Sequence, residues 1–118
     1  SEMCIRDSIS RAWMEEQDLI RRTGKGTRDW TPDEINIILN GKSGKELTSV
    51  MSNMGYTGHH INNVADFPEL AGDPRNIIFL QNANHPSGID EHLLAKQGHR
   101  GNYANTSNGR LIDRKHSH

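Results

Sequence analysis

Two adjacent histidines, His59 and His60, are the residues of this chain whose type and spacing are best suited to chemistry. Successive side chains of a β-strand point to opposite faces, so one imidazole could bind a metal ion while the other acts as a base near neutral pH. Such a pair alone is more often structural. Here, however, Asn76 follows just before an apolar run, and His85 comes just after that run.

This order of residues is the one expected of a ββα metal finger. The histidine pair would lie on the first strand, the asparagine in the connection, and the later histidine at or in the helix. A single divalent ion would then tie strand to helix, and a small fold could be stable with that help.

The later metal ligand has two candidates. His85 has the better spacing after Asn76, but Pro86 follows it and biases His85 away from helical geometry. His92 lies in a segment with a helical pattern and could replace His85 or join it as a ligand. The spacing favours His85, and both histidines stay candidates.

Strands and helices must position these residues, and the hydrophobic pattern predicts both. Thr31 is suited to cap a helix that carries Pro32 at its start and Glu34 for a capping box, and Gly41 is a suitable stop. The short apolar run over residues 77–80 is typical of a buried strand. The predicted order is helices over 8–22, 31–40 and 47–54, strands over 56–61 and 77–80, and a helix over 90–98.

The composition limits the class of protein. The 118 residues suffice for one ordinary domain, and a hydrophobic content of 32% predicts a thin core that a bound metal would help to stabilise. The single cysteine excludes a Cys-rich zinc site, so His, Asp, Glu or Asn must hold any metal. We find no zinc-protease motif, no phosphate-binding Gly-Lys loop, no signal-peptide pattern and no apolar run long enough to span a membrane.

The charge pattern bears on nucleic-acid binding. The net charge is −1 with neutral histidines, which does not by itself indicate a nucleic-acid-binding protein. Basic residues outnumber acidic ones in the C-terminal third, which could hold phosphates or could equally be a solvated tail. Arg75, Arg100 and Arg110 are the candidate phosphate contacts, and each of them could also be ordinary surface charge.

Two segments carry a family resemblance: Gly-His-His-Ile-Asn at residues 58–62 and Asp-Pro-Arg-Asn-Ile-Ile-Phe-Leu at residues 73–80. Segments 30–42, 98–103 and 109–114 extend it. Over roughly residues 28–114, the chain thereby resembles the GHH-signature branch of the HNH/endonuclease VII superfamily. Members of this branch are typically C-terminal nuclease domains of bacterial polymorphic toxins.

The resemblance implies a role for each motif residue. His59 and His85 would bind the metal ion. His60 would be the general base that activates water for attack on a phosphodiester, and Asn76 would hold the loop and orient His60. The resemblance also implies a nucleic-acid substrate, with DNA favoured, and a cognate immunity protein. The domain would be secreted or delivered from a longer parent chain and would act in the cytoplasm of a target cell.

The combined expectation is an α+β protein with N-terminal helices, a ββα-metal finger of the treble-clef-like HNH type, and a loop-rich tail. Residues 1–27 are expected to be a helical extension or linker, and residues 28–118 the nuclease domain. One divalent ion is expected, and the sequence does not distinguish Mg, Mn, Zn and Ni, although two imidazoles favour a transition metal. The alternatives are a non-catalytic binding module stabilised by metal and an inactive toxin remnant.

Overall fold

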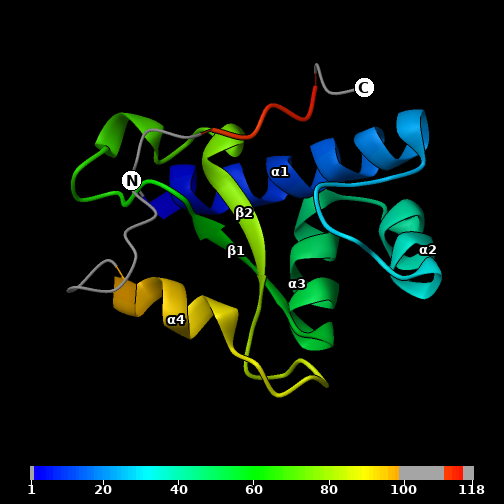
Figure 1. Cartoon of the computed structure of the whole chain (residues 1–118). Helices are drawn as coiled ribbons and strands as arrows, with labels where there is room; N and C mark the ends of the chain where they lie inside the picture. The colour runs from blue at the N-terminus through cyan, green and yellow to red at the C-terminus, as the bar shows by residue number, and fades with distance from the viewer. Residues whose placement is uncertain (1, 99–110, 116–118) are drawn as a thin grey trace.

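The computed structural model describes residues 2–98 and 111–115 and has helices packed around a two-stranded antiparallel sheet (Figure 1). In chain order the elements are α1 (Glu2–Thr23), α2 (Pro32–Asn40), α3 (Gly44–Met54), β1 (Tyr56–His60), η1 (Pro68–Leu70), η2 (Pro74–Asn76), β2 (Ile77–Gln81) and α4 (Glu91–Gly98). α1 runs behind the sheet, and α4 packs against β2 (Figure 1). This arrangement confirms the α+β class. None of the helices in the described part of the chain has the length and apolar character needed to cross a membrane.

Local capping explains where the middle helices begin and end. The Thr31 hydroxyl accepts a hydrogen bond from the Glu34 backbone N–H at 3.2 Å, and the Glu34 carboxylate accepts one from the Thr31 N–H at 2.8 Å. This capping box and the end of α2 before Gly41 confirm the predicted helix. α3 begins earlier than predicted, because Ser43 caps it by accepting from the Glu46 N–H at 3.1 Å.

The sheet decides which way the two adjacent histidines point. β1 pairs with β2 in an antiparallel register, so successive residues of β1 alternate between the two faces. Gly58 and His60 face α1, where a Cβ on Gly58 would lie 2.8 Å from a methyl group of Ile9. His59 faces α4 instead. The close approach of α1 to β1 therefore explains why glycine precedes the two histidines.

α1 contributes to the centre of the core. Its Trp13 stacks on Phe79 of β2 with ring centroids 3.7 Å apart, and Trp30 lies next to both rings. Residues on both sides of position 27 thus share one core, and the division between 1–27 and 28–118 stays a prediction. α1 is also longer than predicted, since no glycine or proline interrupts residues 2–7.

A buried ion pair holds residues 111–115, and nothing in the sequence indicated it. Arg114 Nε donates to Glu16 Oε1 of α1 at 2.8 Å, and both side chains are fully buried. The Glu16 carboxylate also accepts from Trp30 Nε1 at 2.8 Å. The backbone N–H of Ile112 donates to the Arg75 carbonyl at 2.7 Å, which places this segment along η2 (Figure 1).

The outer edge of β2 is satisfied by side chains. Arg114 and Arg28 each donate to a backbone carbonyl of β2 at 2.8 Å. Glu91 accepts from a backbone N–H of the same strand, also at 2.8 Å. Charged side chains along an edge strand satisfy its backbone groups and discourage pairing with another chain. The sheet can therefore stay small. Its open edge is covered by Arg28 from the loop after α1, by Glu91 of α4 and by Arg114 of the C-terminal segment.

Candidate functional site

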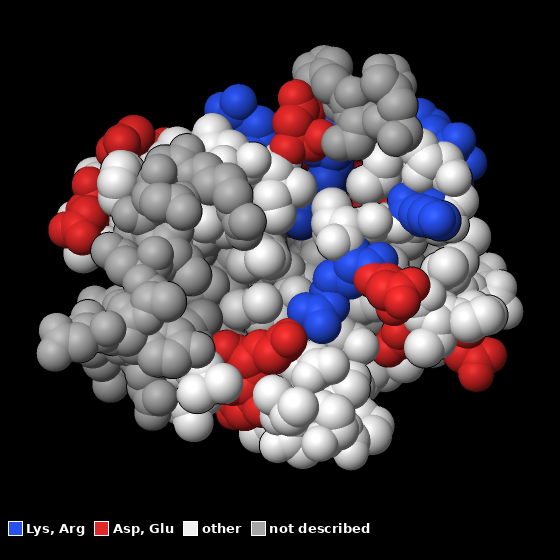
Figure 2. Space-filling view, viewed as in Figure 1, with Lys and Arg blue, Asp and Glu red and all other residues white. Residues whose placement is uncertain are grey.

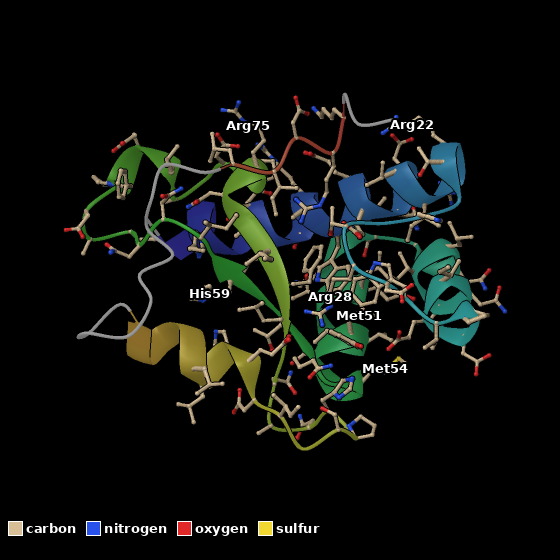
Figure 3. All side chains as sticks on the ribbon, viewed as in Figure 1. Arg22, Arg28, Met51, Met54, His59 and Arg75 are labelled. Atoms are coloured by element: carbon tan, nitrogen blue, oxygen red, sulfur yellow. The ribbon has the colours of Figure 1, made fainter. Side chains whose placement is uncertain are left out.

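His59 of β1 and His92 of α4 lie side by side. Their ring centroids are 5.4 Å apart in a T-shaped arrangement, so strand and helix each bring one imidazole to the same place. His59 is buried and His92 is half-buried. Figure 3 shows His59 on the side of β1 that faces α4. Imidazole nitrogens are donors that suit a transition-metal ion.

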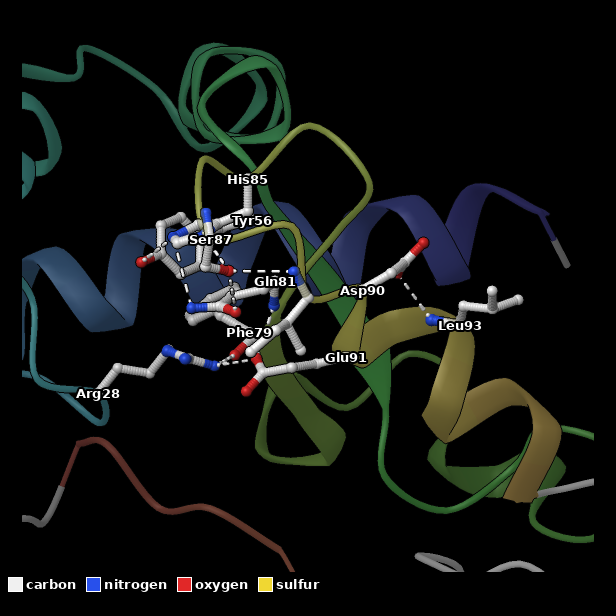
Figure 4. Close-up of polar contacts among 10 residues, drawn as sticks. Arg28, Tyr56, Phe79, Gln81, His85, Ser87, Asp90, Glu91 and Leu93 are labelled. Atoms are coloured by element: carbon white, nitrogen blue, oxygen red, sulfur yellow. Dashed lines mark hydrogen bonds and ion pairs between the residues drawn. The ribbon is translucent and has the colours of Figure 1, made fainter.

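His85, which the spacing favoured, lies elsewhere. Its Nε2 is 3.0 Å from the Tyr56 hydroxyl, and its Nδ1 accepts from the Ser87 backbone N–H at 3.0 Å (Figure 4). The Nε2 contact thus holds the loop after β2 against the start of β1, and the Nδ1 contact lies within that loop. The backbone of this loop comes so close to the turn before β1 that a Cβ on Gly55 would lie 2.5 Å from His85 Cα. The structure therefore brings His92, and not His85, next to His59.

The donor set for a metal ion is small. Among residues 2–98 and 111–115, no three His, Cys, Asp or Glu side chains are grouped closely enough to hold an ion together. The pair of His59 and His92 fits Zn or Ni better than Mg or Mn, because imidazole nitrogen suits the former and oxygen ligands the latter. Further ligands would have to come from substrate, water or residues outside the described ranges.

His60 points to the opposite face of β1 from His59. Its Nε2 lies 3.2 Å from the Ala71 carbonyl oxygen and 3.4 Å from the Ser8 hydroxyl. Because a carbonyl only accepts, Nε2 carries the proton in the neutral ring, and Nδ1 is the basic nitrogen. Burial lowers the pKa of His60 below its ordinary value, and the hydrogen bond to Ala71 offsets this only in part. His60 is therefore neutral at pH 7 and has the form that a general base needs.

Asn76 ties together the loop between the two strands. Its Oδ1 accepts from the Asn62 backbone N–H at 2.8 Å and from Asn62 Nδ2 at 3.0 Å. Its Nδ2 donates to the Asn62 carbonyl at 3.0 Å and to the Leu70 carbonyl at 3.3 Å. Both asparagines are fully buried. Since Leu70 precedes Ala71, Asn76 fixes the segment whose carbonyl holds His60.

Glu91, which precedes His92, and its partner Arg28 gave no functional signal in the sequence. Arg28 Nη1 donates to Glu91 Oε1 at 2.8 Å, and Glu91 directly precedes His92. The two partners are far apart along the chain, so no local pattern joins them. The Ala71 carbonyl was missed for a different reason, because any residue type supplies a backbone carbonyl.

Of the three arginines predicted to contact phosphate, only Arg75 lies among the described residues. Arg75 is exposed but already paired with Asp73, with Nη2 and Oδ2 2.7 Å apart. Arg100 and Arg110 lie outside the described residues. Arg75 borders an open cleft of about 710 Å³ whose lining mixes both charge signs; its charged residues are Arg11, Glu15, Asp73, Arg75, Asp113 and Lys115. Figure 2 likewise shows basic side chains interleaved with acidic ones on the face in view.

The comparison with protein families identifies one match. A sequence profile described as "GHH signature containing HNH/Endo VII superfamily nuclease toxin" matches residues 6–81. The matched range runs from α1 to the end of β2. It contains His59, His60 and Asn76, and it ends before His85 and His92.

Curated relatives are similar over a comparable length. Teneurin-3 of Danio rerio is 35% identical over 80 residues, Teneurin-3 of Mus musculus 32% over 80 residues, and Teneurin-m of Drosophila melanogaster 30% over 76 residues. The alignments cover 68%, 68% and 64% of this chain. The chain spans only 2–3% of the length of these relatives.

Proposed function

The chain belongs to the GHH-signature family of HNH/Endo VII superfamily nuclease toxins, and from this membership we propose that it is a metal-dependent endonuclease that hydrolyses phosphodiester bonds, with DNA the favoured substrate. The observation that carries the proposal is the meeting of His59 and His92, which places two imidazoles from different elements 5.4 Å apart, centroid to centroid. These two residues would hold the ion. When bound, a divalent ion supplies positive charge to the phosphate and to the leaving oxygen.

His60 would act as the general base. Its Nδ1 would take a proton from the water whose oxygen bonds to phosphorus, while the bond from phosphorus to the 3′ oxygen breaks. His60 is the last residue of β1, so base and metal ligand lie on the two faces of one strand end. Asn76 would act through the loop, since the backbone it fixes carries the Ala71 carbonyl that orients His60.

The biological setting is proposed on the family description alone, which names a nuclease toxin. A toxin domain of this kind would be delivered from a longer parent chain and act in the cytoplasm of a bacterial target cell. A cognate immunity protein would protect the producer. Arg75, Arg100 and Arg110 remain the proposed phosphate contacts.

We expect the purified chain to nick supercoiled plasmid when a divalent ion is added, and a chelator to abolish the nicking. Zn, Ni, Mn and Mg are tested in parallel, and agarose electrophoresis follows the conversion of supercoiled to relaxed DNA. Cleavage of RNA without cleavage of DNA would overturn the preferred substrate. If folded protein cuts neither nucleic acid with any of these ions, a non-catalytic metal-stabilised module or an inactive remnant is the better description.

The two candidate ligands are separated by matched alanine variants. His92→Ala should weaken Zn²⁺ binding by more than the roughly 10–100-fold typical of residues that only support a ligand. His85→Ala should keep most of the Zn²⁺ affinity and instead lose about 1–3 kcal/mol of stability, because its partners Tyr56 and Ser87 lose their hydrogen bonds. Titration calorimetry and thermal unfolding give the two readouts. The opposite pattern, with His85→Ala abolishing Zn²⁺ binding, would restore His85 as the ligand.

A further inference from the structure

Glu91 is the first residue of α4, and its side chain joins the helix to the edge of β2. Its Oε1 accepts from the Gln81 backbone N–H at 2.8 Å and from Arg28 Nη1 at 2.8 Å (Figure 4). The same Arg28 nitrogen donates to the Phe79 carbonyl at 2.8 Å, and its guanidinium lies 5.3 Å from the centre of the Tyr56 ring. One carboxylate and one guanidinium thus connect helix, strand edge and sheet face.

This ion pair is more sheltered than the ordinary surface pairs of the molecule. The Arg28 and Glu91 side chains are 24% and 35% exposed, whereas those of Arg22 and Asp18 are 36% and 60% exposed.

Apolar packing does little to fix the first turn of α4, residues 91–94. Leu93 and Leu94 are 48% and 41% exposed, so they do not anchor the helix in the core. The Asp90 carboxylate accepts from the Leu93 N–H at 2.9 Å, which caps the helix but does not tie it to the sheet. The hydrogen bond from the Gln81 N–H to Glu91 is a direct polar tie between the start of α4 and β2.

We propose that Arg28 and Glu91 are positioning residues that set the start of α4 on β2 so that His92 meets His59. The inference rests on the proposed function, in which His59 and His92 hold the ion. Glu91 is the residue next to His92, so a shift at Glu91 is passed directly to the neighbouring imidazole. Outer residues that orient a metal ligand typically contribute about 10–100-fold in metal affinity.

Zn²⁺ titration of the full chain tests this role without relying on activity. Glu91→Ala should weaken Zn²⁺ affinity by about tenfold or more, as expected for a residue that supports a ligand. Glu91→Gln should restore most of it, because the amide oxygen still accepts from Gln81 and Arg28. Asp18→Ala removes a surface pair of similar length, 2.7 Å, and should leave Zn²⁺ affinity unchanged. Circular dichroism verifies that each variant is folded, and Arg28→Met serves as a second variant.

The His92→Ala background separates the possible failures. If Glu91 acts through His92, Glu91→Ala should have no further effect on Zn²⁺ affinity once His92 is gone. An additive loss in the double variant, or wild-type affinity in folded Glu91→Ala and Arg28→Met, overturns the positioning role. If His92→Ala itself binds Zn²⁺ as well as wild type, the proposed ligand pair fails, and the positioning role fails with it.

Discussion

Arg114→Met should lower the free energy of unfolding by about 3–5 kcal/mol, the usual cost of breaking a buried ion pair by removing one partner. Arg114 and Glu16 are both fully buried and 2.8 Å apart, so the substitution leaves a carboxylate enclosed without its cation. It also removes the donors to the Pro74 and Ile77 carbonyls, at 3.2 and 2.8 Å. Urea denaturation followed by circular dichroism measures the change.

A matched substitution and a double variant make this result specific. Arg11→Met breaks an ion pair in which Arg11 and Asp7 are both exposed, and it should cost no more than about 1 kcal/mol. Adding Glu16→Gln to Arg114→Met should recover part of the loss, because a neutral amide can still accept from Trp30. If Arg114→Met costs no more than Arg11→Met, the buried pair does not stabilise the fold more than an exposed one.

The parts of the fold that follow from local rules were predictable. Thr31 and Glu34 form the predicted capping box, and the apolar run at 77–80 lies within β2. These features depend on neighbours a few residues apart. The Arg114–Glu16 pair joins residues 98 positions apart, and no periodicity in the sequence marks it. The same holds for the three charged side chains that satisfy the edge of β2.

The choice between His85 and His92 shows how spacing in the sequence differs from position in the structure. Spacing along the chain favoured His85, whereas the steric effect of Pro86 argued against a helix there. The structure has α4 begin at Glu91, after a loop that His85 itself fastens to Tyr56. Spacing along the chain therefore did not predict that His92 comes to lie beside His59, and the identity of the metal ligand stays a prediction. The position of the His92 side chain beside His59 was also unpredictable, because the approach of α4 to β1 depends on tertiary contacts.

The positions of the histidine pair and of Asn76 were easier to predict from the sequence. The strand that carries the histidine pair and the asparagine before the next strand are both where the motif predicts. Gly58 is explained by the approach of α1, which a Cβ would obstruct. The carbonyl that holds His60 could not be foreseen, because its position depends on how Asn76 folds the loop. The proposed site thus combines side chains that a motif marks with a backbone carbonyl that it does not.

His60→Ala should lower the rate of plasmid cleavage by about 10²–10⁴-fold, the usual contribution of a positioned general base. The variant should stay folded and keep its Zn²⁺ affinity, because His60 faces α1 whereas His59 faces His92. Initial rates at saturating metal, together with calorimetry, measure both properties. Ser8→Ala is the control, since it removes the weaker neighbour of His60 and leaves the Ala71 contact.

The pH dependence of the wild-type rate follows from the same burial. A base acts in its deprotonated form, and the pKa of His60 lies below the ordinary 6.5, so activity should persist as pH falls past 6.5 and be lost only at lower pH. A cation held at His59 would lower this pKa further, in the same direction. His60→Ala should change the acid limb of the residual activity, which then depends only on the metal ligands that must also be deprotonated. If the variant instead cuts at the wild-type rate with the acid limb intact, the base is another group, and His60 serves only to hold the loop through Ala71.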